Sequence, residues 1–297
     1  MAGLPKKAGS KAGGGRMVDL THARHDRAHV LAPGLFRSLA PGDRKKLKLD
    51  VVYDFGKGEQ IEFKGFEPLG VLEMRVLQGL VAMAGPDGMI LEDQDKASPQ
   101  GGQLMLDLFE PDPVVQAAKL KPASLVIRDS LRRLAREIGM DEGGASVKLI
   151  RKAIERMFGV TIFVQTGKRR LGMRMLASYA SDEGTGDLYV ALNPRIAAAI
   201  MGTVPYARID LEEVRQLESD PARFIHQRLC GWIDPGKSGE VGIDALAAYV
   251  WPDVASETQA RWRKSKVRKS IQELAAIGWM VSEVKKDFWR FIRPRVA

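Results

Sequence analysis

The sequence has few of the residues that build metal and redox sites. Its 297 residues include one cysteine, Cys230, and four histidines. A single cysteine cannot form an internal disulfide or a cysteine-rich metal site. The chain also has no apolar run of about 18 residues that would predict a membrane span, and no hydrophobic signal segment follows the basic N-terminus. We therefore expect a cytoplasmic, reduced protein.

Three of the histidines, His22, His25 and His29, lie close together at spacings of three and four. These spacings would place the imidazoles on one face of a helix. No cysteine or other evident fourth ligand lies nearby, so we predict no metal site here and assign these histidines no role.

Positive charge is what the sequence has in excess. It contains 46 Lys and Arg residues against 37 Asp and Glu, a net charge of +9. Such an excess favours polyanionic partners such as nucleic acid. With 45% hydrophobic residues, the chain can also build one large or two modest domains.

The first part of the chain predicts a basic arm and then a hairpin. Met1–Arg16 is rich in Gly, Ala and Lys, which is typical of a flexible segment. Alternating apolar residues on both sides of Gly56–Glu59 predict two antiparallel strands. A helix is expected over Glu73–Ala84. We interpret most of the stretch from Gly85 to Pro122 as a loop, except for a short apolar segment at Leu104–Phe109.

A helix, turn, helix and basic hairpin follow between Ser130 and Ser178. Ser130 is expected to cap a short helix that ends at Gly139, and Ser146–Phe158 predicts a second helix. Two strands then flank a basic tip. This order is the outline of a winged helix. The cations on the outward side of the second helix and at the tip are Lys148, Arg151, Lys152, Lys168, Arg169 and Arg170.

The last hundred residues repeat this order. Ile243–Val250 predicts a short helix, Glu257–Leu274 a longer one, and two strands then flank Lys285 and Lys286. The corresponding elements are offset by roughly 110 to 120 residues, so the repeat is one of architecture. On a helical projection, one face of the longer helix is apolar. The opposite face carries Arg261, Trp262, Ser265, Arg268, Lys269 and Gln272.

From this duplication we predict an α+β fold with two tandem winged-helix domains. The expected divisions are a basic arm at 1–21, an N-terminal domain at 22–205 and a C-terminal domain at 206–297. Trp262 fits a packed interface as well as a DNA contact, and the two interpretations stay open.

Two patterns suggest enzymes, and we discount both. Gly231–Ser238 matches the G-x-x-x-x-G-K-[ST] pattern of a phosphate-binding loop. Such a loop needs a buried strand before it and a helix after it, whereas a helical pattern precedes this one and glycines follow. We expect Asp234–Glu240 to be a loop between helices. Cys230 follows His226 by four residues, but no orienting third group is evident. The adjacent acids Glu212 and Glu213 are expected at the surface or as caps.

Several long runs resemble a known family. They are LAPGLFRSL, KLDVVYDFGKG, EPLG, LQGLVAMAGP, SYASDE, LYVALNP, RLCGWIDPGK and AAYVWP, in order between about His22 and Pro294. These runs are similar to the RepC replication initiators of IncQ-type broad-host-range plasmids. The resemblance implies a bacterial protein that binds double-stranded origin repeats, called iterons, and helps to open the origin. It also implies a plasmid-encoded hexameric helicase and a primase as partners, and allows self-association.

We therefore predict a non-enzymatic replication initiator without a metal or cofactor. The nearest alternative is a winged-helix transcriptional repressor, and a second, from another class, is a P-loop nucleotidase. No set of DNA-contacting residues transfers from the resemblance. The predicted DNA-binding residues therefore depend on the helical projections and the basic tips. They are Lys148, Arg151, Lys152, Lys168, Arg169, Arg170, Arg261, Trp262, Ser265, Arg268, Lys269, Lys285 and Lys286.

Overall fold

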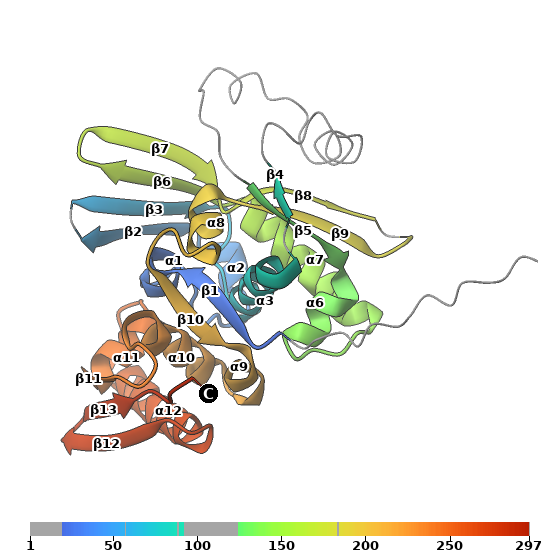
Figure 1. The fold of residues 1–297 in the computed structure, drawn as a ribbon. Coiled ribbons are helices and arrows are strands. Elements are labelled where there is room, and N and C mark those ends of the chain that lie inside the picture. The colour runs from blue at the N-terminus through green and yellow to red at the C-terminus, as the bar shows by residue number, and fades with distance from the viewer. Residues whose placement is uncertain (1–19, 57, 88, 92–123, 183, 297) are drawn as a thin grey trace, which may run out of the picture.

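The computed structural model describes residues 20–56, 58–87, 89–91, 124–182 and 184–296. These residues form a mixed α+β fold (Figure 1). The predicted arm lies almost entirely outside the described residues, and the segment Leu104–Phe109 lies entirely outside them. Within the described ranges, every helix is too short or too polar to cross a membrane.

The C-terminal part contains the helices and the hairpin that the sequence predicts. Its sheet has the order β11-β13-β12, and α10, α11 and α12 pack together beside it. The predicted loop after α10 is partly wrong, because its last residues form β11 and pair with β13. The elements are α10 (Asp220–Trp232), β11 (Ser238–Gly242), α11 (Ile243–Val250), α12 (Glu257–Ala276), β12 (Met280–Lys285) and β13 (Phe288–Ile292).

The N-terminal part is larger, and its described residues form two four-stranded sheets, β2-β3-β6-β7 and β4-β5-β9-β8. Its helices are α1 (Arg27–Leu31), α2 (Asp43–Lys46), α3 (Val71–Asp87), α6 (Leu131–Glu137), α7 (Gly144–Phe158), α8 (Pro194–Ile200) and α9 (Leu211–Gln216). Its strands are β1 (His22–Asp26), β2 (Leu49–Gly56), β3 (Glu59–Gly65), β4 (Met89–Leu91), β5 (Ser124–Ser130), β6 (Thr161–Thr166), β7 (Arg169–Arg174), β8 (Leu176–Ser181), β9 (Asp187–Leu192) and β10 (Tyr206–Asp210).

Two hairpins of the N-terminal part share one sheet, which the sequence did not predict. Strand β3 pairs with β6 along Glu59–Lys64, so the β2–β3 hairpin and the β6–β7 hairpin become continuous. Alternate side chains Ile61, Phe63 and Ile162 are fully buried below this sheet. Their shared apolar face explains the pairing, since both hairpins must cover the same core.

The predicted helix pair forms as expected. The Ser130 hydroxyl accepts a hydrogen bond from the Arg133 amide and so caps α6. Gly139, at φ +69°, turns the chain after that helix, in a conformation that glycine adopts without a steric cost. Helix α7 then buries Ile150, Ile154 and Met157.

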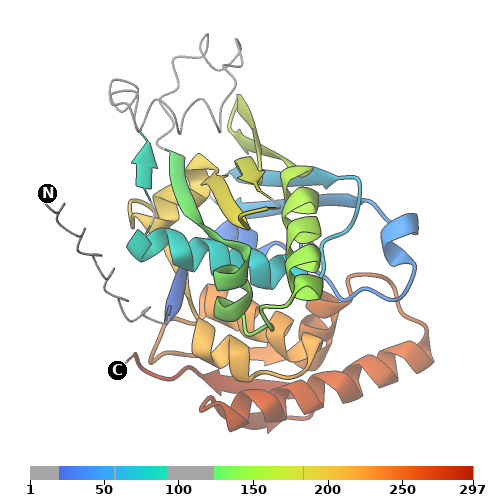
Figure 2. The same ribbon diagram turned by 90° about the vertical axis from the view of Figure 1, so that its right-hand side faces the viewer.

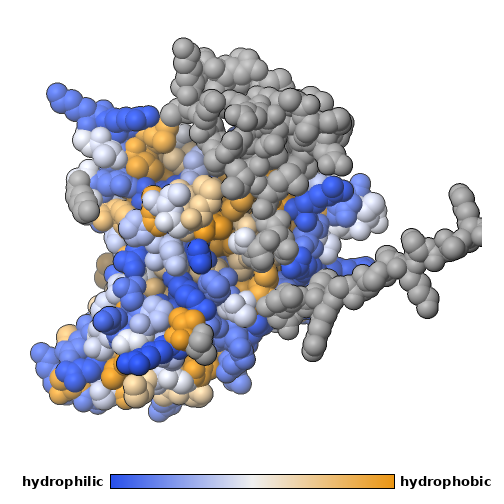
Figure 3. Space-filling model, viewed as in Figure 1, coloured by the Kyte–Doolittle hydropathy of each residue, from blue (hydrophilic) through white to orange (hydrophobic). Residues whose placement is uncertain are grey.

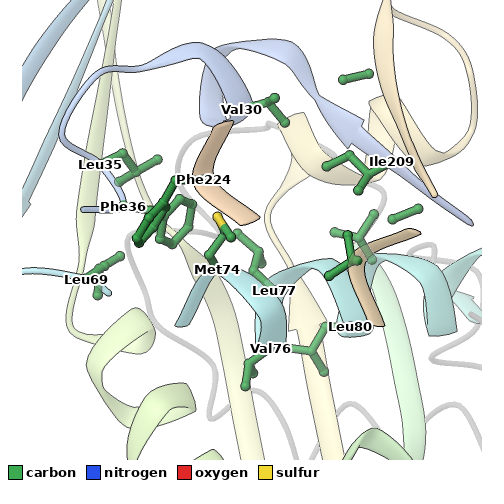
Figure 4. Packing of buried hydrophobic residues seen from close by; sticks show 14 of the residues in the cluster. Val30, Leu35, Phe36, Leu69, Met74, Val76, Leu77, Leu80, Ile209 and Phe224 are labelled. Atoms are coloured by element: carbon green, nitrogen blue, oxygen red, sulfur yellow. The ribbon is translucent and has the colours of Figure 1, made fainter. Parts of the chain in front are cut away.

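A strand pair crosses the predicted division between residues 205 and 206. Strand β1 pairs with β10 from His22↔Asp210 to Asp26↔Tyr206. Phe36 and Met74 also belong to one buried cluster with Phe224 of α10 (Figure 4). The division between residues 205 and 206 stays a prediction, but the strand pair crosses it and the core is continuous across it.

The histidine interpretation was wrong in its geometry. His22 and His25 lie on strand β1, and His29 lies on α1, so the three do not share a helical face. The Asp26 carboxylate instead accepts a hydrogen bond from His29, with Nδ1 2.7 Å from Oδ1. Arg195 Nε donates to the other oxygen of Asp26 at 3.0 Å. These residues tie α1 to α8.

Asp26 should stabilise the protein in a way that depends on pH. Burial would raise its pKa, but hydrogen bonding to His29 and the charges of His29 and Arg195 outweigh burial and lower the pKa to about 2. A folded-state pKa below the unfolded value means that this stability is present above about pH 4 and is lost as the pH falls toward 2. We expect Asp26→Asn to cost about 3 kcal/mol in urea unfolding at neutral pH.

The matched control is Asp234→Asn, which breaks the more exposed 2.7 Å ion pair between Asp234 and Arg27. Exposed pairs contribute about 1 kcal/mol or less. Equal losses in the two variants would show that the buried network has no special stabilising role.

Candidate nucleic-acid interface

Helix α12 presents the basic face that its sequence predicts. Ser256 and Gln259 form a capping box at its N-terminus, which satisfies free amides there. Val267, Ile271 and Leu274 are buried against the core. The residues predicted for the opposite face are all exposed: Arg261, Trp262, Ser265, Arg268, Lys269 and Gln272.

Two of these arginines already pair with acids. Arg261 contacts Glu257 one helical turn away, and both side chains are largely exposed. Arg268 donates to Asp287 at 2.6 Å. Asp287 has φ 62° and lies at the tip of the β12–β13 hairpin. Arg268 therefore fastens this hairpin to α12, a role that the helical projection could not predict.

The hairpin tip carries two further predicted cations. Lys285 lies 4.9 Å from the centre of the Phe288 ring, and its charge faces that ring. Lys286 is exposed. Lys269 and Lys286 make no ion pair within the described part of the chain, so their charges are available to a partner.

Helix α7 places a smaller basic group elsewhere. Lys148 and Lys152 are exposed, whereas Arg151 is partly buried and interacts with the rest of the protein. Figure 2 shows α7 (green) in the upper half of the molecule and α12 (orange-red) along its lower edge. The two predicted helices thus form two separate basic surfaces.

The β6–β7 hairpin is the third location of predicted cations. Lys168 and Arg169 are exposed near its tip, which Figure 1 shows pointing away from α7. Figure 3 shows this projecting end covered with hydrophilic residues. Arg170 instead donates to both carboxylate oxygens of Glu62, at 2.7 and 3.0 Å. That hydrogen bonding lowers the pKa of Glu62, and Arg170 serves to brace the sheet.

The structure adds two residues that the sequence analysis missed. Lys266 is exposed and lies 5.6 Å from the centre of the Trp262 ring. Its position four residues after Trp262 is the signal that could have identified it. Leu149 on α7 is 49% exposed beside Lys148. Trp262 itself contacts Trp251, with ring centroids 5.4 Å apart, yet is 52% exposed.

The phosphate-loop pattern has a packing explanation. Gly231 lies inside α10, where a Cβ atom would come within 2.5 Å of Leu31. Gly236 has φ +75° in the following turn. Lys237 and Ser238 lead into strand β11 instead of a helix. A phosphate loop requires a helix N-terminus at that point, so the geometry does not support nucleotide binding.

A buried cluster surrounds Cys230, and here the expected surface position of Glu213 was wrong. Glu213 on α9 reaches His226, with Oε2 2.6 Å from Nε2, and accepts from Trp279 Nε1 at 3.0 Å. Cys230 Sγ lies 3.6 Å from the same His226 nitrogen. Two ligands on a tetrahedral zinc ion would be about 3.3 Å apart. The 2.6 Å separation is instead that of a hydrogen bond.

Comparisons with solved structures define the class of fold. The chain is similar to a crystal structure of domains 2 and 3 of RctB, with a TM-score of 0.53 and 10% identity over 90% of this chain and 97% of that one. A second structure of RctB domains 2–3 gives a TM-score of 0.51 and 13% identity, over 90% and 96%. The shared feature is the mixed α+β fold. No curated protein sequence matches the chain.

The family follows from a sequence model. The model of Replication protein C (RepC) matches residues 17–295. The chain belongs to the RepC family and is a plasmid replication initiator.

The His226 cluster predicts that stability declines at alkaline pH. Burial would lower the pKa of His226, but the contacts with Cys230 and Glu213 outweigh it and raise the pKa to about 10. A folded-state pKa above the unfolded value means that this stability is complete below about pH 6.5 and is lost as the pH rises toward 10. Urea unfolding between pH 6.5 and 9.5 should show this decline.

In Glu213→Gln, stability should fall less between pH 6.5 and 9.5, because the variant lacks the carboxylate that favours the protonated form of His226. The variant should also be less stable than the wild type at pH 6.5. Parallel pH profiles for the two proteins would contradict this account of the cluster.

Proposed function

We propose that this RepC-family initiator binds double-stranded DNA at the repeats of its replication origin through α7 and α12. The observation that supports this most strongly is α12 itself. It is anchored by a buried apolar face, capped at its N-terminus and exposed along a cationic face. A major groove about 12 Å wide admits one such helix.

The order of elements in the C-terminal part supports a winged helix. Helix α10, strand β11, helices α11 and α12, and the β12–β13 hairpin follow one another in this order. In this proposal α12 enters the groove, and Lys285 and Lys286 contact the flanking backbone. Arg268 keeps the hairpin at a fixed angle to the helix through Asp287.

The N-terminal part supplies the second winged helix of the proposal. Helices α6 and α7 correspond to α11 and α12, with Lys148 and Lys152 facing the DNA. The tip of the β6–β7 hairpin, with Lys168 and Arg169, provides a further backbone contact. Arg170 supports this hairpin from the side through Glu62.

The finer steps come from the family resemblance. The repeats would be iterons of an IncQ-type origin, and several bound copies would open an adjacent A·T-rich segment. A plasmid-encoded hexameric helicase and a primase would then join. The initiator itself would need no catalytic site or cofactor.

Substitutions on the basic surfaces test DNA binding. Lys152→Ala and Lys269→Ala should each weaken binding to the origin duplex and to unrelated duplex alike. Each should also reduce the slope of log K against log salt by about 0.9, because one phosphate contact is lost. Arg261→Ala should cost about 1–3 kcal/mol and relax sequence preference if that arginine contacts a base. Fluorescence anisotropy across a salt series measures all three.

Lys45→Ala is the control, since Lys45 is an exposed cation on α2, outside both proposed helices. It should leave the affinity and the salt slope close to those of the wild type. If both Arg261→Ala and Lys269→Ala bind the origin duplex as tightly as the wild type, α12 is not part of the DNA-binding surface.

The arrangement of the two helices also predicts DNA bending. In Figure 2 the axes of α7 and α12 run in clearly different directions. For both helices to enter major grooves of one duplex, we expect that duplex to curve, and curvature also helps an initiator to strain an origin. Energy transfer between dyes at the two ends of an origin duplex should rise on binding. An unchanged transfer efficiency at saturation would mean that the two helices do not both engage one bent duplex.

A further inference from the structure

Leu149 and Trp262 occupy the same place in the repeated unit. Leu149 is the sixth residue of α7, which begins at Gly144, and Trp262 is the sixth residue of α12, which begins at Glu257. Each is followed, five residues later, by a buried core residue, Ile154 or Val267. The two side chains therefore point outward at the same level of equivalent helices.

Both side chains are exposed apolar groups among cations. Leu149 is 49% exposed and Trp262 is 52% exposed, and in the described chain no other large apolar residue of α7 or α12 is as exposed. Lys148 precedes the leucine, as Arg261 precedes the tryptophan. A single exposed leucine needs no explanation. Two exposed apolar groups at one position of a repeated, basic helix suggest a shared partner.

The chemistry of the major groove identifies that partner. A leucine side chain has no hydrogen-bonding group, so it can recognise only an apolar surface. Among the base edges in the major groove, the apolar group is the C5 methyl of thymine. An apolar protein surface would not explain the cations on both sides, whereas a polyanion does.

We propose that Leu149 and Trp262 each contact a thymine methyl group when α7 and α12 enter the major groove. This inference rests on the proposed function and adds two specificity-determining residues to it. Trp262 is held for the contact, because its ring lies against Trp251 and Lys266. The two residues should read different thymines, because their helices lie on separate surfaces of the molecule.

The test removes one methyl group at a time. The wild-type chain first selects a duplex from a randomised library at a fixed salt concentration. Each thymine of that duplex is then replaced by deoxyuridine, which removes only the C5 methyl. Wild-type affinity should fall about fourfold at each contacted thymine, the value expected for one buried methyl-sized group.

Two variants assign the methyl groups to the side chains. Leu149→Ala should bind the thymine duplex about fourfold more weakly. Its affinity should no longer fall at one of the positions where deoxyuridine weakens binding of the wild type. Trp262→Ala should become indifferent to a different one. Met201→Ala is the control, because Met201 is also an exposed apolar residue, 39% exposed, but follows α8. It should keep wild-type affinity and every methyl dependence.

The outcomes separate this inference from the function on which it rests. If the wild type selects no duplex above background, both fail. If it selects one but both variants keep every methyl dependence, only the inference fails, and the two side chains serve another partner such as a protein. Circular dichroism of each variant confirms that the substitutions leave the fold intact.

Discussion

Helix α10 holds the two parts of the chain together, because it packs against α1, α3 and β10 as well as against α11 and α12. Almost every side chain of this helix is buried or partly buried, and Gly231 lets it approach Val30 and Leu31 closely. The buried polar side chains of this helix find hydrogen-bond partners on neighbouring helices. Gln227 bonds Gln78 of α3 at 2.7 Å, and His226 bonds Glu213 of α9.

These contacts provide a rigid surface on which the basic helix α12 packs. Helix α12 packs on α10, and Trp279, just before β12, donates to the same Glu213 carboxylate that holds His226. The exposed face of α12 can then consist almost entirely of charge and polar groups, because its stability comes from the opposite side. A long cationic helix without such a base would lose stability to repulsion between its own charges.

Some cations of the basic surfaces maintain the fold, whereas others are free to bind a partner. Arg170 and Arg268 each hold a hairpin through an acid, Glu62 or Asp287. Lys269 follows Arg268 in the sequence, and neither Lys269 nor Lys152 makes an ion pair with an acid within the described chain. Arg170 and Arg268 therefore hold the hairpins in place, and Lys152 and Lys269 supply positive charge to the surface. Arg170 shows the geometry that favours arginine in such a role, since its planar guanidinium meets both oxygens of the Glu62 carboxylate.

Local sequence patterns determined much of this protein. The apolar period of α12, the Ser130 cap and the glycine turns predicted helices and hairpins that the structure confirms, because these features depend on residues within one or two turns. The positions of Lys148, Lys152 and Lys269 on outward faces followed from the same periods. No local pattern predicted that β3 pairs with β6, that His22 and His25 lie on a strand, that Glu213 contacts His226, or that Arg268 binds Asp287. These contacts join residues distant in sequence, and no local period carries information about which distant surface a buried face will meet.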